Sequence, residues 1–228
     1  MEEIKKRDCY ETPQYLADWA VAYGHQKVVR VRAAEVLRSM GCREGLLITN
    51  LTEALSAPYH MMEPGCGESA PFCNAALKRG YKAHAVEYRI LDFLNKDILT
   101  SNVDFLLSYA EPARCAFDLI ATNPPFSQAE PFIRRSLELL KPYGVAVFLL
   151  RLGFLASLKR RVLYRDRPPS AVHVLQHRPS FSHDGRTDAQ EYAFYTWMGS
   201  AIPVEHTTLE WLDTKSLYEA WRSNSSVS

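Results

Sequence analysis

The chain has 228 residues, of which 47% are apolar and 23% are charged, as in an ordinary soluble globular protein. This length allows one substantial hydrophobic core and leaves no room for two ordinary domains with a linker. The 27 basic and 26 acidic residues give a formal charge of +1. That balance excludes a whole-protein field that attracts polyanions, so a nucleic acid would have to bind to a local basic patch.

The five cysteines are scattered along the chain, and none of them forms a CxxC pair. No histidine cluster accompanies them, so the sequence predicts no metal site. An odd and scattered set of cysteines is typical of reduced thiols in the cytoplasm. The N-terminus has no apolar segment of the signal-peptide kind, and no apolar run has the length of a membrane span. We therefore expect a cytoplasmic protein.

The N-terminal segment, residues 1–58, is expected to be helical and to pack on the rest of the chain. Thr12 is a candidate N-cap with Pro13 at the first helical position, and an apolar stripe of helical spacing follows. We expect this helix to stop near Gly24. A second helix is predicted over residues 27–40.

Strand patterns and helix patterns alternate from residue 59 onward. Strands are predicted at residues 59–63, 82–87, 117–122, 145–150, 171–176 and 191–198, helices at 71–78 and 130–140, and short elements at 90–94 and 104–107. Pro142 and Gly144 are expected to stop the second of these helices. This alternation predicts an α/β fold, a doubly wound and mostly parallel sheet with right-handed crossovers.

We expect residues 1–228 to form a single domain. Its α/β core would span residues 59–198, and a C-terminal extension would span residues 199–228. The last six residues, Ser-Asn-Ser-Ser-Val-Ser, are polar and lie at the chain end, so the tail over residues 223–228 is expected to be disordered.

Residues 65–70 read Gly-Cys-Gly-Glu-Ser-Ala after a predicted strand, and they match the G-x-G-x-x-G/A pattern of nucleotide-binding turns. Glu87 lies twenty residues past Gly67, at the end of the next strand, where such folds place the carboxylate that binds ribose hydroxyls. Glu63 and Glu68 flank the turn and would repel a phosphate, so an adenosine that carries a cationic group fits better. A glycine turn before a helix can also be a turn without any ligand.

Residues 117–126 read Phe-Asp-Leu-Ile-Ala-Thr-Asn-Pro-Pro-Phe, an apolar strand that ends in a stiff turn. Pro124 and Pro125 lack a backbone N–H and fix φ, so neither a helix nor a central strand continues through them. Asn123 and Phe126 therefore belong to a rigid corner that places carbonyl oxygens beside a flat ring. Such a corner can hold a planar amino group by its two hydrogens, although a plain strand-ending turn is the alternative.

Together these motifs resemble the class I S-adenosylmethionine-dependent amino-methyltransferases, which have a Rossmann-like fold. Among them, the chain is similar to N6-adenine DNA methyltransferases of the small phage type, in which the cofactor motif precedes Asn-Pro-Pro. The resemblance covers residues 10–198 and includes an N-terminal Tyr-x-Thr-Pro motif and the segment 178–197. Two features depart from the family, because Ser69-Ala70 replaces the usual aromatic residue and no long insertion could serve as a target-recognition domain.

The resemblance implies a role for each matching residue. The residues that would bind S-adenosylmethionine are Tyr10, Thr12, Pro13, Glu63, Gly65, Gly67, Glu87, Asp104, Phe105 and Asn123. The catalytic turn would consist of Asn123, Pro124, Pro125 and Phe126. The residues that would contact the DNA substrate are Phe181, Lys159, Arg160 and Arg161. Plainer alternatives stay open, since Phe181 can be a core residue, Asp104-Phe105 is short enough to occur by chance, and residues 159–161 can be a solvated face.

The predicted function is transfer of a methyl group from S-adenosylmethionine to the N6 amine of adenine in DNA. The Asn123 side-chain oxygen and the Pro124 carbonyl would accept the two N–H bonds of this amine. The same site would also suit adenine N6 or guanine N2 in RNA, cytosine N4 in DNA, or a protein glutamine. An NAD-dependent oxidoreductase is a further alternative, but that function would not account for Asn-Pro-Pro-Phe. A non-catalytic binding protein is another, but such a protein would not need to keep all the residues of the site.

Overall fold

The computed structural model describes residues 11–40, 56, 58–89, 95–107, 116–181 and 187–225. In these ranges eight strands form one sheet in the order β3-β2-β1-β4-β5-β7-β6-β8. Only β7 among them runs antiparallel to its neighbours, so the predicted mostly parallel, doubly wound sheet is confirmed. The strands are β1 His60–Pro64, β2 Lys82–Glu87, β3 Ile98–Asn102, β4 Phe117–Thr122, β5 Leu140–Arg151, β6 Ala171–Leu175, β7 Tyr192–Met198 and β8 Thr208–Leu212.

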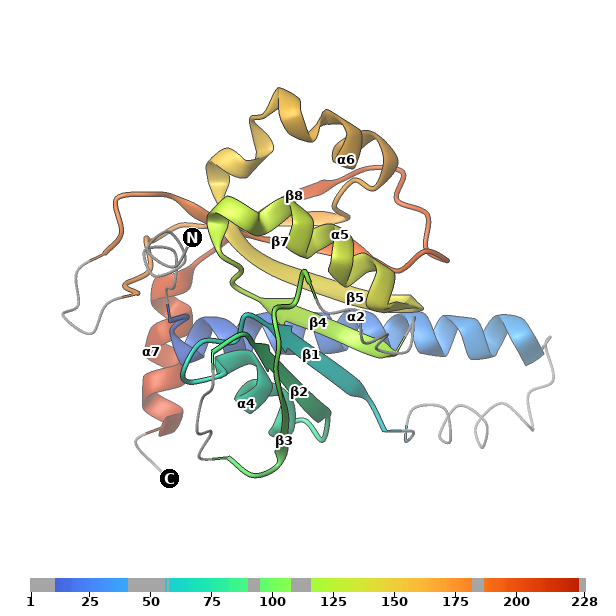
Figure 1. The fold of residues 1–228 in the computed structure, drawn as a ribbon, viewed down its shortest axis with the longest axis horizontal. Helices are drawn as coiled ribbons and strands as arrows, with labels where there is room; N and C mark the ends of the chain where they lie inside the picture. The colour runs from blue at the N-terminus through green and yellow to red at the C-terminus, as the bar shows by residue number, and fades with distance from the viewer. Residues whose placement is uncertain are drawn as a thin grey trace.

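Helices cover both faces of the sheet (Figure 1). The helices are α2 Gln14–Met40, α4 Pro71–Leu77, α5 Ala129–Leu139, α6 Arg161–Asp166 and α7 Thr214–Ser225, with short 3-10 turns η1 Phe126–Gln128, η2 Leu152–Leu155 and η3 Leu158–Arg160. Successive residues of a strand point to opposite faces, so Leu119 of β4 packs with α2 and α4 while Ile120 packs with α5 and α6. None of the helices in the described ranges is long and apolar enough to cross a bilayer.

The prediction that a helix stops near Gly24 is wrong, because α2 is continuous from Gln14 to Met40. A Cβ atom at Gly24 would lie 2.6 Å from Cδ1 of Leu119 and 3.4 Å from Cγ2 of Val147. The glycine therefore lets the helix approach β4 and β5 closely and does not terminate it. The helix begins one residue later than predicted, since the Pro13 carbonyl accepts its first backbone hydrogen bonds.

Three further expectations need correction. The helix α5 ends at Leu139, before Pro142 as expected, but it passes directly into β5, which begins at Leu140 instead of residue 145 and runs through Pro142 and Gly144. This is possible because the pairing of β4 with β5 jumps from Leu140 to Val145, so the missing N–H of Pro142 removes no bond from the ladder. Residues 223–225, which were expected to be disordered, belong to α7. Residues 104–107, expected to be a short element, form a turn. The predictions for residues 90–94 and 226–228 lie outside the described ranges.

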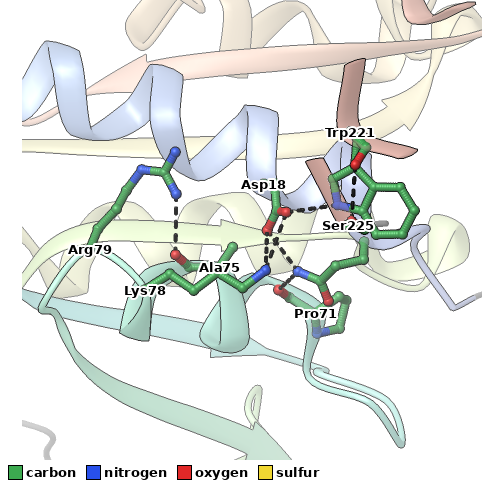
Figure 2. A network of polar contacts seen from close by, with 8 residues as sticks. Asp18, Pro71, Ala75, Lys78, Arg79, Trp221 and Ser225 are labelled. Atoms are coloured by element: carbon green, nitrogen blue, oxygen red, sulfur yellow. Dashed lines mark hydrogen bonds and ion pairs between the residues drawn. The ribbon is translucent and has the colours of Figure 1, made fainter. Parts of the chain in front are cut away.

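The helix α7 is connected to α2 and α4 by a polar network around Asp18 (Figure 2). The Asp18 carboxylate accepts a hydrogen bond of 3.1 Å from Nε1 of Trp221, and Nζ of Lys78 lies 3.4 Å away. Gln14 donates to Asp18 at 2.9 Å and to the Pro71 carbonyl at 2.9 Å. The network therefore fixes the start of α2 against the start of α4.

Candidate active site

A cleft with a volume of about 350 Å³ opens at the carboxyl edge of the sheet. It lies where the strand order reverses between β1 and β4, the position at which doubly wound sheets bind ligands. The predicted residues that line it are Thr12, Glu63, Gly65, Gly67, Glu87, Asp104, Phe105, Asn123, Pro125 and Phe181. The predicted residues that the structure describes but does not place in its lining are Pro13, Pro124, Phe126, Lys159, Arg160 and Arg161. Tyr10 lies outside the described residues.

The glycine turn folds back onto the end of β2. Gly65 and Gly67 have φ values of 66° and 65°, which L side chains rarely adopt. The N–H of Gly65 donates to the Val86 carbonyl at 2.7 Å, and a Cβ on Gly65 would approach the Phe132 ring to 3.2 Å. Both positions therefore require glycine for their backbone conformation, and Gly65 also requires it because the Phe132 ring is close. Both glycines line the cleft.

Glu87 ends β2 and faces the glycine turn. One carboxylate oxygen accepts a hydrogen bond of 3.2 Å from the N–H of Gly67, and the other accepts one of 3.2 Å from Nε of Arg89. Arg89 also lies 3.7 Å from Glu68. Among the described residues in the lining, the acidic ones are Glu11, Glu63, Glu68, Glu87 and Asp104, and the basic one is Arg89. The lining therefore favours a cationic ligand over an anionic one.

Glu63 differs from the other carboxyl groups because it is completely buried. It accepts a hydrogen bond of 2.8 Å from the N–H of Cys73, in the first turn of α4. Burial raises the pKa of Glu63 to about 8, so the group is largely protonated at neutral pH. The expected repulsion of phosphate around the turn therefore comes mainly from Glu68 and Glu87 and much less from Glu63.

The turn after β4 lies beside the glycine turn. The hydroxyl of Thr122 donates a buried hydrogen bond of 2.6 Å to the carbonyl of Pro64, and this bond joins the ends of the two strands. Asn123 lines the cleft with its Oδ1 shielded from solvent. Pro125 closes the corner, because its carbonyl accepts a hydrogen bond of 2.9 Å from the N–H of Gln128. Asn123 and Pro125 of the stiff proline corner therefore line the same cavity as the glycine turn.

Aromatic rings gather beside this corner. Phe126 lies 5.6 Å from Tyr192 between ring centroids, and Phe181 lies 4.9 Å from Tyr192 in an edge-on arrangement. The guanidinium of Arg151 covers the Phe126 ring at 4.5 Å. Phe181 thus packs against the core and lines the cleft at the same time, so the two alternatives for this residue are compatible.

Two other pairs of predicted residues have plainer contacts. The Phe105 ring is buried and packs on Phe132 at 5.0 Å, while Asp104 accepts a hydrogen bond of 3.0 Å from the N–H of Leu106. Arg160 stacks on Phe154 at 4.0 Å and donates to its carbonyl at 3.0 Å, so it stabilises its own loop. Lys159 and Arg161 are exposed to solvent.

Sequence reasoning did not identify several residues of the site. Those in the lining are Glu11, Pro71, Val86, Tyr88, Arg89, Val103, Gln128 and Phe132. Tyr88 and Val103 are partly exposed although they are apolar, and each directly adjoins a predicted cofactor residue in the chain. Their position next to Glu87 and Asp104 is the signal that could have found them.

No protein-family model matches the sequence, and no curated protein matches it. Solved structures share its fold. A protein assigned as an RNA methyltransferase from Pyrococcus horikoshii is 13% identical with a TM-score of 0.51, over 83% of this chain and 87% of its own. A protein assigned as a class I S-adenosylmethionine-dependent methyltransferase from Listeria monocytogenes is 12% identical with a TM-score of 0.52, over 88% of this chain and 78% of its own. The chain therefore has the fold of the Rossmann-like class I methyltransferases.

Proposed function

We propose that the chain is an S-adenosylmethionine-dependent methyltransferase that acts on the N6 amine of adenine in DNA. The observation that carries this proposal is that the glycine turn and two residues of the Asn-Pro-Pro-Phe turn, Asn123 and Pro125, line one cleft from adjacent strands. The glycine turn has the features of a site that binds a nucleoside, and the Asn-Pro-Pro-Phe turn has the features of a site that binds an amine. A transferase for a methyl group needs both within one cavity.

The residues of the cleft fit S-adenosylmethionine. Its ribose hydroxyls would be bound by Glu87, and its adenine by the turn at Asp104 and Phe105. Its methionine part, which carries an ammonium group and a sulfonium, suits the acidic lining around Gly65 and Gly67. The pyrophosphate of NAD would be repelled by the same carboxylates, which disfavours the oxidoreductase alternative. When bound, S-adenosylmethionine supplies a methyl group activated by a positively charged sulfur.

The protein's part in the reaction is to hold the amine and to stabilise its charge. The lone pair of an exocyclic adenine amine is delocalised into the ring, so the nitrogen is a poor nucleophile. The Asn123 side-chain oxygen and the Pro124 carbonyl would accept its two N–H bonds and favour a pyramidal nitrogen. These acceptors would also stabilise the positive charge that develops as the new bond forms. No strong base is required, because the methylated ammonium is acidic and loses its proton to solvent.

The aromatic residues beside the corner would hold the target base outside the duplex. Removing a base from the duplex costs a few kcal/mol of stacking and pairing free energy, and stacking on aromatic rings of the protein offsets part of this cost. Phe126 and Phe181 would supply that surface. Because Arg151 covers one face of Phe126, a base would stack on the other face. DNA is favoured as the substrate by the resemblance of residues 178–197, whereas an amine in RNA is the alternative to be tested.

The direct test is to incubate the protein with methyl-labelled S-adenosylmethionine and separate pools of DNA, RNA and protein. Nucleoside analysis of the DNA pool is expected to show labelled N6-methyladenine. Label found only in RNA would show that the substrate is RNA and not DNA. Absence of label from all three pools, with a cofactor that binds, would refute the proposal.

Two variants separate the cofactor half of the site from the amine half. Asn123→Ala is expected to lower kcat by about a hundredfold or more, as for the loss of one preorganised polar group, and to change the Kd for S-adenosylmethionine far less. Glu87→Ala is expected to raise that Kd instead. Glu130→Ala, on the exposed face of α5, is the matched control for removal of a carboxylate. Normal turnover by Asn123→Ala would contradict the proposed role of the amide.

A further inference from the structure

Arg151 ends β5 and contacts residues on both sides of the proposed base pocket. Its guanidinium lies 4.5 Å from the centroid of the Phe126 ring, in the turn after β4. In the antiparallel pairing of β5 with β7 it is the direct partner of Tyr192, and the two side chains interact electrostatically. Arg151 thus connects the Asn-Pro-Pro-Phe turn to the first residue of β7.

Tyr192 extends this connection to the segment that carries Phe181. The Tyr192 ring is fully buried, and its hydroxyl donates a hydrogen bond of 2.8 Å to Oδ2 of Asp188. The backbone N–H of Asp188 in turn donates to the Pro179 carbonyl at 3.2 Å. The Phe181 ring meets Tyr192 edge-on at 4.9 Å. This series of contacts therefore runs from Arg151 through Tyr192 and Asp188 to the segment of Phe181, whose ring lines the cleft.

We propose that Arg151 is a positioning residue that sets the separation of Phe126 and Phe181, the two rings proposed to hold the target base. The inference rests on the proposed function, since it concerns the same pocket. Arg151 does not line the cleft, so it acts through the rings that it holds. A guanidinium suits this task because one planar group can stack on a ring and donate hydrogen bonds in its plane at the same time.

A lysine could not replace it. An ammonium is a compact charge without a plane, so it cannot cover Phe126 and also reach Tyr192 in the fixed geometry of a fork. If the purpose of Arg151 were only to attract a DNA phosphate, lysine would be an adequate substitute. The Arg151→Lys variant therefore separates positioning from simple attraction of charge.

The variants Arg151→Met, Arg151→Lys and Tyr192→Phe test the inference, with Arg134→Met as the control. Arg134 is an arginine on α5 that pairs with Glu130 at 2.8 Å, away from the rings. The three test variants are expected to raise KM for a DNA duplex or lower kcat by about tenfold, as for a small displacement of groups that hold a reactant. The Kd for S-adenosylmethionine is expected to stay unchanged, because its proposed ligands lie on other strands.

A second measurement does not depend on activity. In protein labelled with 4-fluorophenylalanine, the ¹⁹F resonances of Phe126 and Phe181, assigned by Phe→Leu substitution, are expected to shift or broaden in the test variants. They are expected to stay in place in Arg134→Met. Unmoved resonances in Arg151→Met, or full recovery of both readouts by Arg151→Lys, would overturn the inference. Failure of the wild-type protein to methylate DNA would refute the proposed function instead, and the resonances would still decide the positioning role.

Discussion

Replacing Glu63 by glutamine is expected to remove a large part of the pH dependence of the protein's stability. The buried carboxyl has a pKa of about 8 in the folded protein, against an ordinary value of 4.5, because burial disfavours its charged form. The folded state therefore keeps a proton that the unfolded chain releases. Its contribution to stability is complete below about pH 4.5 and is lost as the pH rises to about 8.

The size of this effect follows from the two pKa values. At about 1.4 kcal/mol per pH unit, the loss of stability between pH 4.5 and pH 8 amounts to about 5 kcal/mol as an upper limit. Glu63→Gln retains an oxygen that can accept the hydrogen bond from the N–H of Cys73 and has no proton to lose. At pH 5 the two proteins are expected to be about equally stable, and at pH 9 the variant is expected to be more stable by several kcal/mol.

Urea unfolding at pH 5, 7 and 9, followed by circular dichroism, measures the difference between the two proteins. Burial, the main cause that raises the pKa of the Cys66 and Cys73 thiols, is the same in both proteins, whereas the smaller contribution of Glu63 to these shifts is lost in the variant. Glu68→Gln, at an exposed carboxylate of the same turn, is the control and is expected to show no such trend. If the free energies of unfolding of wild type and Glu63→Gln stay parallel across this range, the reasoning about the buried proton is refuted.

Other variants test the remaining packing and charge arguments. Binding of S-adenosylmethionine is expected to release a proton near pH 7 because its positive charge favours ionised Glu63; calorimetry in buffers of different ionisation enthalpy would detect this, and Glu63→Gln would show no release. Gly24→Ala is expected to lower the free energy of unfolding by about 1–2 kcal/mol, because contact with Leu119 outweighs the better helix propensity of alanine; Gly153→Ala, with open space around it, is the control, and an equal effect in both would contradict this. Trp221→Phe is expected to cost about 1 kcal/mol in thermal unfolding through loss of its bond to Asp18, and an unchanged Tm would show that α7 is held by other contacts.

The strands that carry the site could be predicted because each is a buried apolar run that ends in unusual residues. The edge strands β3 and β8 could not, since most of their residues are exposed and lack the continuous apolar signature of a buried strand. Gly24 was misinterpreted because its neighbours, Leu119 and Val147, lie far away in sequence. A local pattern cannot distinguish a glycine that ends a helix from one that admits a packed strand.

The same distinction applies to the site. The glycine turn, Glu87 and Asn123 share a cleft because the carboxyl ends of parallel strands meet at one edge, a rule that can be applied to a sequence. The contact of Arg151 with Tyr192 depends on the register between β5 and β7, which the separate strand patterns do not contain. The hydrogen bond between Glu87 and Arg89 likewise depends on how the chain turns after β2.

The bond from the Thr122 hydroxyl to the Pro64 carbonyl has a broader consequence for how such a protein can diversify. It ties together two neighbouring strand ends, about 4.8 Å apart in any sheet, so the proposed cofactor site and the proposed amine site share one rigid frame. The ring at Phe181, by contrast, is delivered by a connection between β6 and β7. Replacement of that connection would change which substrate the proposed pocket accepts. The distance between the proposed cofactor site and the proposed amine site would stay the same, because the backbone of β1 and β4 sets it. Selection for new targets is therefore expected to act on the loop and to leave this frame untouched.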